Sequence, residues 1–327
     1  MFRLGIIGCG TVSQYGHLPA VAGSKDWMLT AVADIDSSRL ESVRKTYKPP
    51  HAFTDYRDLL ALPGLDAVVV ATHVDTHCEI AVAALGRGLH VLCEKPMAAT
   101  LAQCREMVEA ARQAGRLLAV NFNSRCGPVY REIKRLIDLG TVGKVRVVRF
   151  VLDWSAHQWR QAERMEHFMT GGGPLMDSAV HFFEGVRWFT GQEFQDIRAH
   201  GLILPPYENP QHGIATCLLT DGSIALVEAG WIYCKRTKDQ GSLFQIDVIG
   251  DDGAISYDAT SATLRIYTQS GTEQRRLEDT GKHFELAYSL FAESIRRGEL
   301  VELASGEDGL KATEASLVAL AAARNRR

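Results

Sequence analysis

Short apolar segments alternate with longer amphipathic segments over the first third of the chain. The apolar segments have the length of buried strands and cover residues 3–8, 28–34, 66–71, 89–93 and 117–121. The segments between them have the length and spacing of helices and cover residues 12–22, 37–47, 75–88 and 100–114. Strands that alternate with helices of this length predict βαβ units and a parallel sheet. We therefore expect an α/β domain over residues 1–123.

The pattern changes after residue 123. An amphipathic helix is predicted over 128–139, a strand over 145–152 and a helix near 174–189. Runs with strand character then follow one another without helices between them, over 196–204, 213–220, 223–231, 242–250, 254–258 and 262–267. This succession predicts a mostly antiparallel, open sheet in an α+β domain over 124–327. Helices over 284–297 and 306–323 close the chain, and the last could pack back on the first domain.

A glycine-rich turn follows the first predicted strand and opens a helix. Gly8 and Gly10 suit a tight turn that lets the backbone approach a pyrophosphate, and Thr11 and Val12 would add backbone N–H donors at the helix start. Ser13 occupies the position of the usual third glycine.

Asp34 ends the second predicted strand, where a carboxylate can bind ribose hydroxyls and repel a 2′-phosphate. Arg39, five residues later, could meet a phosphate. The pattern predicts a dinucleotide site and favours NAD over NADP.

Two later strand ends carry further candidates. The loop that begins at Thr72 would lie over the cofactor, and His77 in it is either a ligand or a hydrogen-bonded structural residue. Glu94-Lys95-Pro96 ends the strand over 89–93, at the edge where open α/β sheets bind ligands. Lys95 is therefore either a surface charge or a catalytic amine.

A second candidate site follows three glycines. Pro174 suits the first turn of a helix, and Asp177 and His181 are spaced to share one face of that helix. A carboxylate can orient an imidazole for proton transfer. The alternative is a structural Asp–His pair on a solvated face.

Composition narrows the function classes. The chain has 327 residues and a formal net charge of −3, without a basic stripe, so we expect no nucleic-acid partner. No apolar run is long enough for a membrane span, and the N-terminus lacks the layout of a signal peptide. The seven cysteines form no CxxC pair, so we expect reduced thiols, a cytoplasmic location and no metal site.

The chain resembles the glucose-fructose oxidoreductase/inositol dehydrogenase/rhizopine catabolism (Gfo/Idh/MocA) family of NAD(P)-dependent enzymes. The resemblance spans nearly the whole chain. It rests on Gly8-Cys9-Gly10, Ala33-Asp34, Ala71-Thr72 with His77, Glu94-Lys95-Pro96, Asn123-Ser124-Arg125, Gly171 to Asp177 with His181, Gly250 with Gly253, and Glu307-Asp308-Gly309 with Glu314-Ala315. Departures from the family pattern include His73, Ser13, Ala179 and Cys126.

The resemblance implies a Rossmann domain, a nicotinamide cofactor and hydride transfer to or from a secondary alcohol or ketone of a sugar, cyclitol or related polyol. By the same resemblance Lys95 polarises the substrate oxygen, His181 moves the hydroxyl proton and Asp177 biases His181. It also places Glu94 near the nicotinamide ribose, and implies a homodimer or homotetramer. We expect substrate contacts from Arg125, Trp154, Trp159 and Asp177.

Two other functions stay open from the sequence. Some relatives oxidise a sugar transiently and then cleave a glycosidic bond, which leaves NAD unchanged overall. Others bind NAD and a ligand as sensors without catalysis. A sensor has no need of Lys95, Asp177 and His181 together, and the chain has all three.

Overall fold

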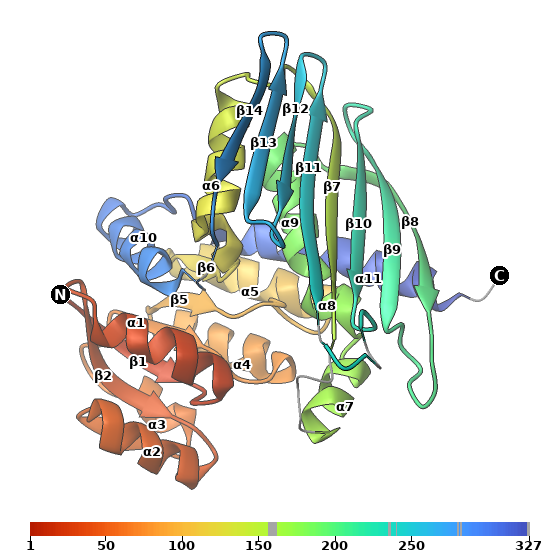
Figure 1. Ribbon diagram of the computed structural model, residues 1–327. Helices are drawn as coiled ribbons and strands as arrows, with labels where there is room; N and C mark the ends of the chain where they lie inside the picture. The colour runs from red at the N-terminus through yellow and green to blue at the C-terminus, as the bar shows by residue number, and fades with distance from the viewer. Residues whose placement is uncertain (156–161, 235–236, 240, 280, 282, 326–327) are drawn as a thin grey trace. The chain divides into compact units, whose positions relative to one another are not determined.

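The structure, a computed structural model, describes residues 1–155, 162–234, 237–239, 241–279, 281 and 283–325 (Figure 1). The chain divides into two compact units. The first combines Met1–Cys126 with Lys282–Lys311, and the second combines Gly127–Gly281 with Ala312–Arg327. The sequence placed the boundary between residues 123 and 124 and allowed the last helix to pack back on the first domain. In the structure, Lys282–Lys311 belong to the first unit.

The first unit is built on a seven-stranded sheet. Its strands, in spatial order, are β15 (Ala304–Ser305), β6 (Leu118–Val120), β5 (His90–Cys93), β4 (Ala67–Val70), β1 (Phe2–Ile7), β2 (Trp27–Ala33) and β3 (His51–Phe53). Every neighbouring pair is parallel except β15 with β6. The order of β3 to β6 is that of the Rossmann fold, which reverses direction between β1 and β4. The predicted parallel α/β domain is confirmed.

Helices connect these strands, and their ends follow from local sequence. They are η1 (Ser13–His17, a π-helix), α1 (Leu18–Ala22), α2 (Ser37–Tyr47), α3 (Tyr56–Leu60), α4 (Val74–Gly86), α5 (Leu101–Ala114), the 3₁₀ turn η2 (Asn123–Cys126) and α10 (Phe284–Arg297). Asp36 begins α2 by accepting hydrogen bonds from the N–H groups of Ser38 and Arg39. Thr100 and Gln103 form a reciprocal capping box at the start of α5.

Helix α10 completes the core of the first unit. Its Phe284, Tyr288 and Phe291 are almost fully buried beside residues of β1, η1 and β2. The ring of Phe291 stacks on Trp27 with centroids 5.4 Å apart, and the Trp27 indole N–H donates to the Tyr288 carbonyl over 2.8 Å. Burial of aromatic rings is a large favourable term in folding, so the first unit depends on residues from near the end of the chain.

The second unit is built on an eight-stranded sheet. Its strands, in spatial order, are β14 (Gly271–Arg276), β13 (Thr263–Thr268), β12 (Gly253–Asp258), β11 (Ser242–Gly250), β7 (Val145–Trp154), β10 (Ile224–Gly230), β9 (His212–Leu219) and β8 (Phe194–Leu202). Only β7 and β10 pair in parallel among these neighbours. The predicted mostly antiparallel sheet is confirmed.

Helices cover one face of this sheet. They include α6 (Pro128–Asp138), α8 (Pro174–Asp177), α9 (Ala179–Thr190) and the part of α11 (Gly306–Arg324) from Ala312 onward. Helix α7 (Ala162–Thr170) contacts α8. Figure 1 shows α6 and α9 lying along the sheet, and Phe150 of β7 stacks on Phe182 of α9 with centroids 5.2 Å apart. Buried and exposed residues alternate along β9, as expected where one face of a sheet is covered, and among the described residues no helix lies on the other face.

Within the described residues, no helix has both the length and the apolar character that crossing a bilayer requires.

Candidate active site

The turn after β1 has the geometry that its glycines predicted. Gly8 has φ +98°, and a Cβ there would lie 2.4 Å from the carbonyl oxygen of Ala71 at the end of β4. A Cβ at Gly10, by contrast, would meet nothing within 4 Å. Gly8 is thus required by the fold itself, whereas Gly10 leaves an open approach to the backbone. Thr11 is exposed and Val12 is half-buried at the start of η1.

Ser13 has a role that the sequence did not show. Its side chain is buried, and its hydroxyl donates to the carbonyl of Gly8 over 2.5 Å. The serine therefore braces the turn from within, in the position where relatives of this motif carry a third glycine.

Asp34 lies at the end of β2, next to this turn. One carboxylate oxygen accepts from the N–H of Cys9 over 2.7 Å, and the other accepts from the N–H of Asp36 over 2.8 Å. Arg39 approaches the carboxylate to 3.9 Å. Burial, together with the charge of Asp34, raises the pKa of the Cys9 thiol to about 12, so this cysteine stays protonated. The carboxylate is held against the turn, at the place predicted for a ribose.

His77 joins two of the predicted loops. Its ring is buried, with Nδ1 3.1 Å from the carbonyl oxygen of Pro96 and Nε2 3.2 Å from that of Thr72. Burial lowers the pKa of His77 and favours the neutral ring. The hydroxyl of Thr72 lies 2.8 Å from that of Thr76. These contacts tie the loop after β4 to the segment that contains Lys95.

Glu94 lies at the end of β5 inside a polar cluster. Its Oε1 accepts from Asn121 Nδ2 over 2.5 Å and lies 3.1 Å from His17 Nε2, while Oε2 accepts from the N–H of Lys95 over 3.3 Å. Burial alone would raise the pKa of Glu94, but His17, Asn121 and the charge of Lys95 outweigh it and lower the pKa to about 2. Glu94 is therefore a buried carboxylate, and Lys95 beside it is half-buried.

Sequence reasoning missed the partners of Glu94. Asn121 directly follows β6, so its place at the same edge of the sheet was open to prediction. His17 comes from η1, and its Nδ1 lies 2.9 Å from the hydroxyl of Tyr288 on α10. A contact across 271 residues leaves no local signal in one sequence.

The second candidate site lies in the second unit. Gly172 has φ +111° and Gly173 has φ +64°, and a Cβ at Gly173 would lie 2.7 Å from the carbonyl of Pro210. The expected single helix is interrupted at Ser178, so Asp177 ends α8 and His181 lies in the first turn of α9. The interruption is a tightened turn, because the N–H of His181 bonds to the carbonyl of Ser178, three residues back, over 3.1 Å. Both side chains are half-buried.

The residues predicted to contact the substrate come from both units. Trp154 ends β7 and packs beside Trp231, with ring centroids 6.3 Å apart, in a small apolar cluster with Met169. Arg125 belongs to the first unit, where its guanidinium lies 3.5 Å from the carboxylate of Asp308. Trp159 lies outside the described residues.

The structure thus gathers Gly8, Gly10, Asp34, Thr72 and Glu94-Lys95 at the carboxyl edge of the first sheet, around the point where the strand order reverses. This edge is where open α/β sheets bind ligands. Lys95 is held by the first unit, and Asp177 and His181 are held by the second.

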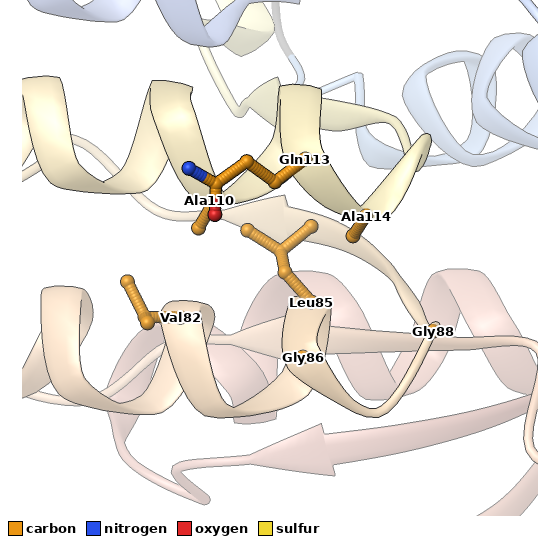
Figure 2. A pocket seen from close by; sticks show the side chains of 7 residues that line it. All are labelled: Val82, Leu85, Gly86, Gly88, Ala110, Gln113 and Ala114. Atoms are coloured by element: carbon orange, nitrogen blue, oxygen red, sulfur yellow. The ribbon is translucent and has the colours of Figure 1, made fainter.

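A hollow between α4 and α5 has different chemistry. Figure 2 shows it lined by Val82, Leu85, Gly86, Gly88, Ala110, Gln113 and Ala114. Gly88 lies in the turn after α4, and the other residues come from the C-terminal halves of α4 and α5, which run back toward the amino ends of the strands. The lining carries no charged group, and it lies at the sheet edge opposite Lys95.

Comparisons with known proteins agree with this arrangement. A family model described as an oxidoreductase family with an NAD-binding Rossmann fold matches residues 2–122, and a GFO/IDH/MocA C-terminal domain model matches residues 130–256.

Among curated proteins, the chain is 30% identical to the inositol 2-dehydrogenase/D-chiro-inositol 3-dehydrogenase of Shouchella clausii, over 88% of this chain and 81% of that protein. It is 28% identical to the myo-inositol 2-dehydrogenase of Thermotoga maritima, over 94% and 92%.

A solved structure of scyllo-inositol dehydrogenase from Lactobacillus casei, with bound NAD(H) and scyllo-inositol, has the same fold. The TM-score is 0.83 at 23% identity, and the match covers 98% of this chain and 96% of that one.

Proposed function

Because this chain belongs to the Gfo/Idh/MocA family of oxidoreductases, we propose that it transfers a hydride between a nicotinamide and a secondary alcohol or ketone of a cyclitol, sugar or related polyol. The family assignment makes the chain an oxidoreductase with an NAD-binding domain. The relatives named above are dehydrogenases of inositols, which supports a polyol substrate. They also favour a dehydrogenase over a glycosidase or a ligand sensor.

One observation carries the cofactor part of the proposal. The residues at the carboxyl edge of the first sheet fit a dinucleotide, since Gly10 leaves its backbone open and Gly8 holds the turn against β4. The N–H groups at the start of η1 would hold the pyrophosphate, and Asp34 would hold the adenosine ribose. The bound nicotinamide would supply the hydride acceptor or donor.

We infer a preference for NAD over NADP from the surroundings of Asp34. Asp34 is only 9% exposed, and its carboxylate is fixed by two backbone N–H groups. A 2′-phosphate would place a second negative charge beside it, while Arg39, 3.9 Å away, offsets only part of that repulsion. Comparing NADH and NADPH affinities tests this preference directly.

The chemical roles follow from the side chains. Lys95 would donate a hydrogen bond to the substrate oxygen and stabilise negative charge as the hydroxyl is deprotonated. His181 would accept that proton, since an imidazole titrates near neutral pH. Asp177 would contact the substrate and favour the protonated form of His181. Arg125, Trp154 and Trp159 remain candidates for substrate contact.

We further propose a homodimer or homotetramer that works in the cytoplasm. Three large apolar side chains, Ile214, Leu218 and Ile224, are 37%, 38% and 50% exposed on the helix-free face of the second sheet. Leu218 and Ile224 are direct cross-strand neighbours, and such a patch is typical of an interface. All seven cysteines are free thiols, which fits a reducing compartment.

The test of function is an activity screen. The purified protein is incubated with NAD and, separately, with inositol isomers, aldoses, ketoses and sugar acids, and NADH formation is followed by absorbance. The proposal requires turnover with at least one polyol that depends on Lys95. NADH binding without turnover on any of these substrates would favour the sensor, and release of an aglycone from glycosides without net NADH would favour the glycosidase.

A further inference from the structure

The polar cluster beneath Glu94 is a continuous chain of hydrogen bonds inside an apolar core. It runs from the Tyr288 hydroxyl to His17 Nδ1 over 2.9 Å, and from His17 Nε2 to Glu94 Oε1 over 3.1 Å. The side chain of His17 is fully buried and that of Glu94 is 10% exposed. Apolar side chains surround these hydrogen bonds. The ring of Phe284 packs edge to face against that of His17, with ring centroids 4.8 Å apart.

The direction of these hydrogen bonds follows from their ends. A carboxylate only accepts, so His17 Nε2 carries the hydrogen that it shares with Glu94. In a neutral imidazole Nδ1 is then an acceptor, and the hydroxyl of Tyr288 donates to it. Burial raises the pKa of Tyr288 well above its usual value, so this hydroxyl keeps its hydrogen. With a neutral imidazole, these hydrogen bonds are therefore all donated in the direction from α10 toward Glu94.

The two oxygens of Glu94 are used unequally. Oε1 takes hydrogen bonds from both His17 and Asn121, whereas in the described part of the chain Oε2 takes only the N–H of Lys95, at 3.3 Å. A carboxylate oxygen can accept two hydrogen bonds. Oε2 thus keeps room for one further donor, beside the lysine that the proposed function assigns to the substrate.

Stability alone does not account for this arrangement. Burying a carboxylate is costly, and a well-packed apolar cluster of the same volume is often equally or more stable. The Glu94 carboxylate lies at the sheet edge where the cofactor is expected. We therefore look for a role of this carboxylate as a hydrogen-bond acceptor for the cofactor.

We propose that His17, oriented by Tyr288, is a positioning residue that holds Glu94 as the hydrogen-bond acceptor for the nicotinamide ribose, with Asn121 as the second anchor. The inference rests on the proposed function, because it requires a nicotinamide nucleotide in the site. A ribose hydroxyl donating to Oε2 would be a charge-assisted hydrogen bond, stronger than a neutral one. Loss of the His17 donor lets burial raise the pKa of Glu94, so binding becomes sensitive to pH.

The experiment measures the dissociation constant of NADH by fluorescence titration between about pH 8 and about pH 5. In the wild type Glu94 stays ionised over this range, so its contribution to affinity is constant. In His17→Leu the affinity falls as Glu94 takes up a proton, by about tenfold at the acid end. In His17→Gln the side-chain amide can still donate to Glu94, and the profile returns toward that of the wild type.

Two further variants separate positioning from packing. Trp27→Phe removes a buried hydrogen bond to the backbone of Tyr288 and lowers the melting temperature, but it leaves the donors to Glu94 in place. The pH dependence of its NADH dissociation constant should match that of the wild type. Tyr288→Phe removes a single oxygen and should produce the pH dependence of His17→Leu in weaker form. If His17→Leu does not fold, Tyr288→Phe decides the question.

Other groups that titrate near Glu94 do not confound the comparison. They are His77 on α4, Tyr288 on α10, His17 on η1, Cys93 at the end of β5, and Lys95 directly after Glu94. Because Tyr288→Phe keeps His17 and all the other titratable groups except Tyr288, a pH dependence shared by Tyr288→Phe and His17→Leu reports Glu94.

The possible failures are distinguishable. Flat profiles in folded His17→Leu and Tyr288→Phe, with NADH bound as tightly as by the wild type, overturn the positioning role and leave the proposed function intact. A wild type that does not bind NADH overturns the proposed function instead.

Discussion

Replacing Gly8 or Gly10, the two glycines of the turn after β1, by alanine should change the stability of the fold in opposite directions. At Gly8 a methyl group would lie 2.4 Å from the Ala71 carbonyl oxygen and 2.9 Å from the N–H nitrogen of Thr72, both of them backbone atoms of the β4 end. At Gly10 the same methyl group would meet no atom of the chain within 4 Å, and φ lies outside the left-handed region. Gly8→Ala therefore tests the fold, whereas Gly10→Ala tests the site.

The magnitudes can be worked from these contacts. The positive φ of Gly8 costs alanine about 1–2 kcal/mol, and the overlap with backbone adds about 1–3 kcal/mol. The sum, about 2–5 kcal/mol, corresponds to a loss of roughly 5–20 °C in melting temperature for a unit of this size. Gly10→Ala should instead stabilise by about 0.4–1 kcal/mol, since it restricts the unfolded chain. Its methyl group obstructs the pyrophosphate, and one lost charge-assisted hydrogen bond weakens NADH binding about tenfold or more.

The assay pairs thermal unfolding with NADH titration on both variants. A Gly8→Ala protein that melts like the wild type would show that the strand ends are not in contact as described. A Gly10→Ala protein that keeps full NADH affinity would show that the pyrophosphate does not approach this turn, and the reasoning for the cofactor site would fail.

Three other predictions concern charged groups of the first unit. Lys95→Met should leave the NADH dissociation constant within a few-fold of wild type and lower kcat by orders of magnitude; equal kcat values would remove Lys95 from the mechanism. Asp34→Ala should lower the ratio of the NADPH to the NADH dissociation constant. Asp34→Asn is the control, because it keeps a hydrogen-bond acceptor for the N–H of Cys9. A wild type that binds NADPH more tightly than NADH would contradict the assignment. The pKa of Glu94 is lowered from 4.5 to about 2, so its ionisation stabilises the fold by about 3 kcal/mol above pH ~4.5, and this contribution is lost as the pH falls toward ~2. Urea unfolding of the wild type and Glu94→Gln should therefore differ most at neutral pH and converge in acid, and a constant difference would show that Glu94 is not ionised in the folded protein.

Elements with a strong local pattern were predictable from the sequence. The helix over 37–47 was predicted with the limits that the structure shows, because Asp36 caps it and Lys48 follows its last turn in the left-handed conformation. The helix over 284–297 agrees in the same way, since Gly298 ends it. The buried strand β4, a run of alanine and valines, lies inside the predicted range.

Elements without such a pattern were missed. The edge strand β14 is polar and almost wholly exposed, so no alternation marks it. The three-residue strand β3 is too short to show a period. The break at Ser178 depends on how the chain turns after Gly173, and the spacing of Asp177 and His181 alone suggests one continuous helix.

The candidate site likewise contains residues that the sequence predicted and residues that it did not. Gly8, Asp34 and Lys95 were found because each stands at the end of a recognisable strand. The surroundings of Glu94 were not found, because His17 and Tyr288 are 271 residues apart in the chain and meet only after folding. Single-sequence reasoning locates residues that a motif places, and it does not show which distant side chains set their charge.

The late return of the chain to its first unit has a consequence for biosynthesis. Met1–Cys126 leaves the ribosome long before α10 is translated, by roughly 10–30 s at a rate of about 5–20 residues per second. Throughout that interval Trp27 and its neighbours lack the aromatic side chains that cover them in the finished protein. We expect the nascent nucleotide-binding half to remain a client of ribosome-associated chaperones until its own C-terminal helix arrives.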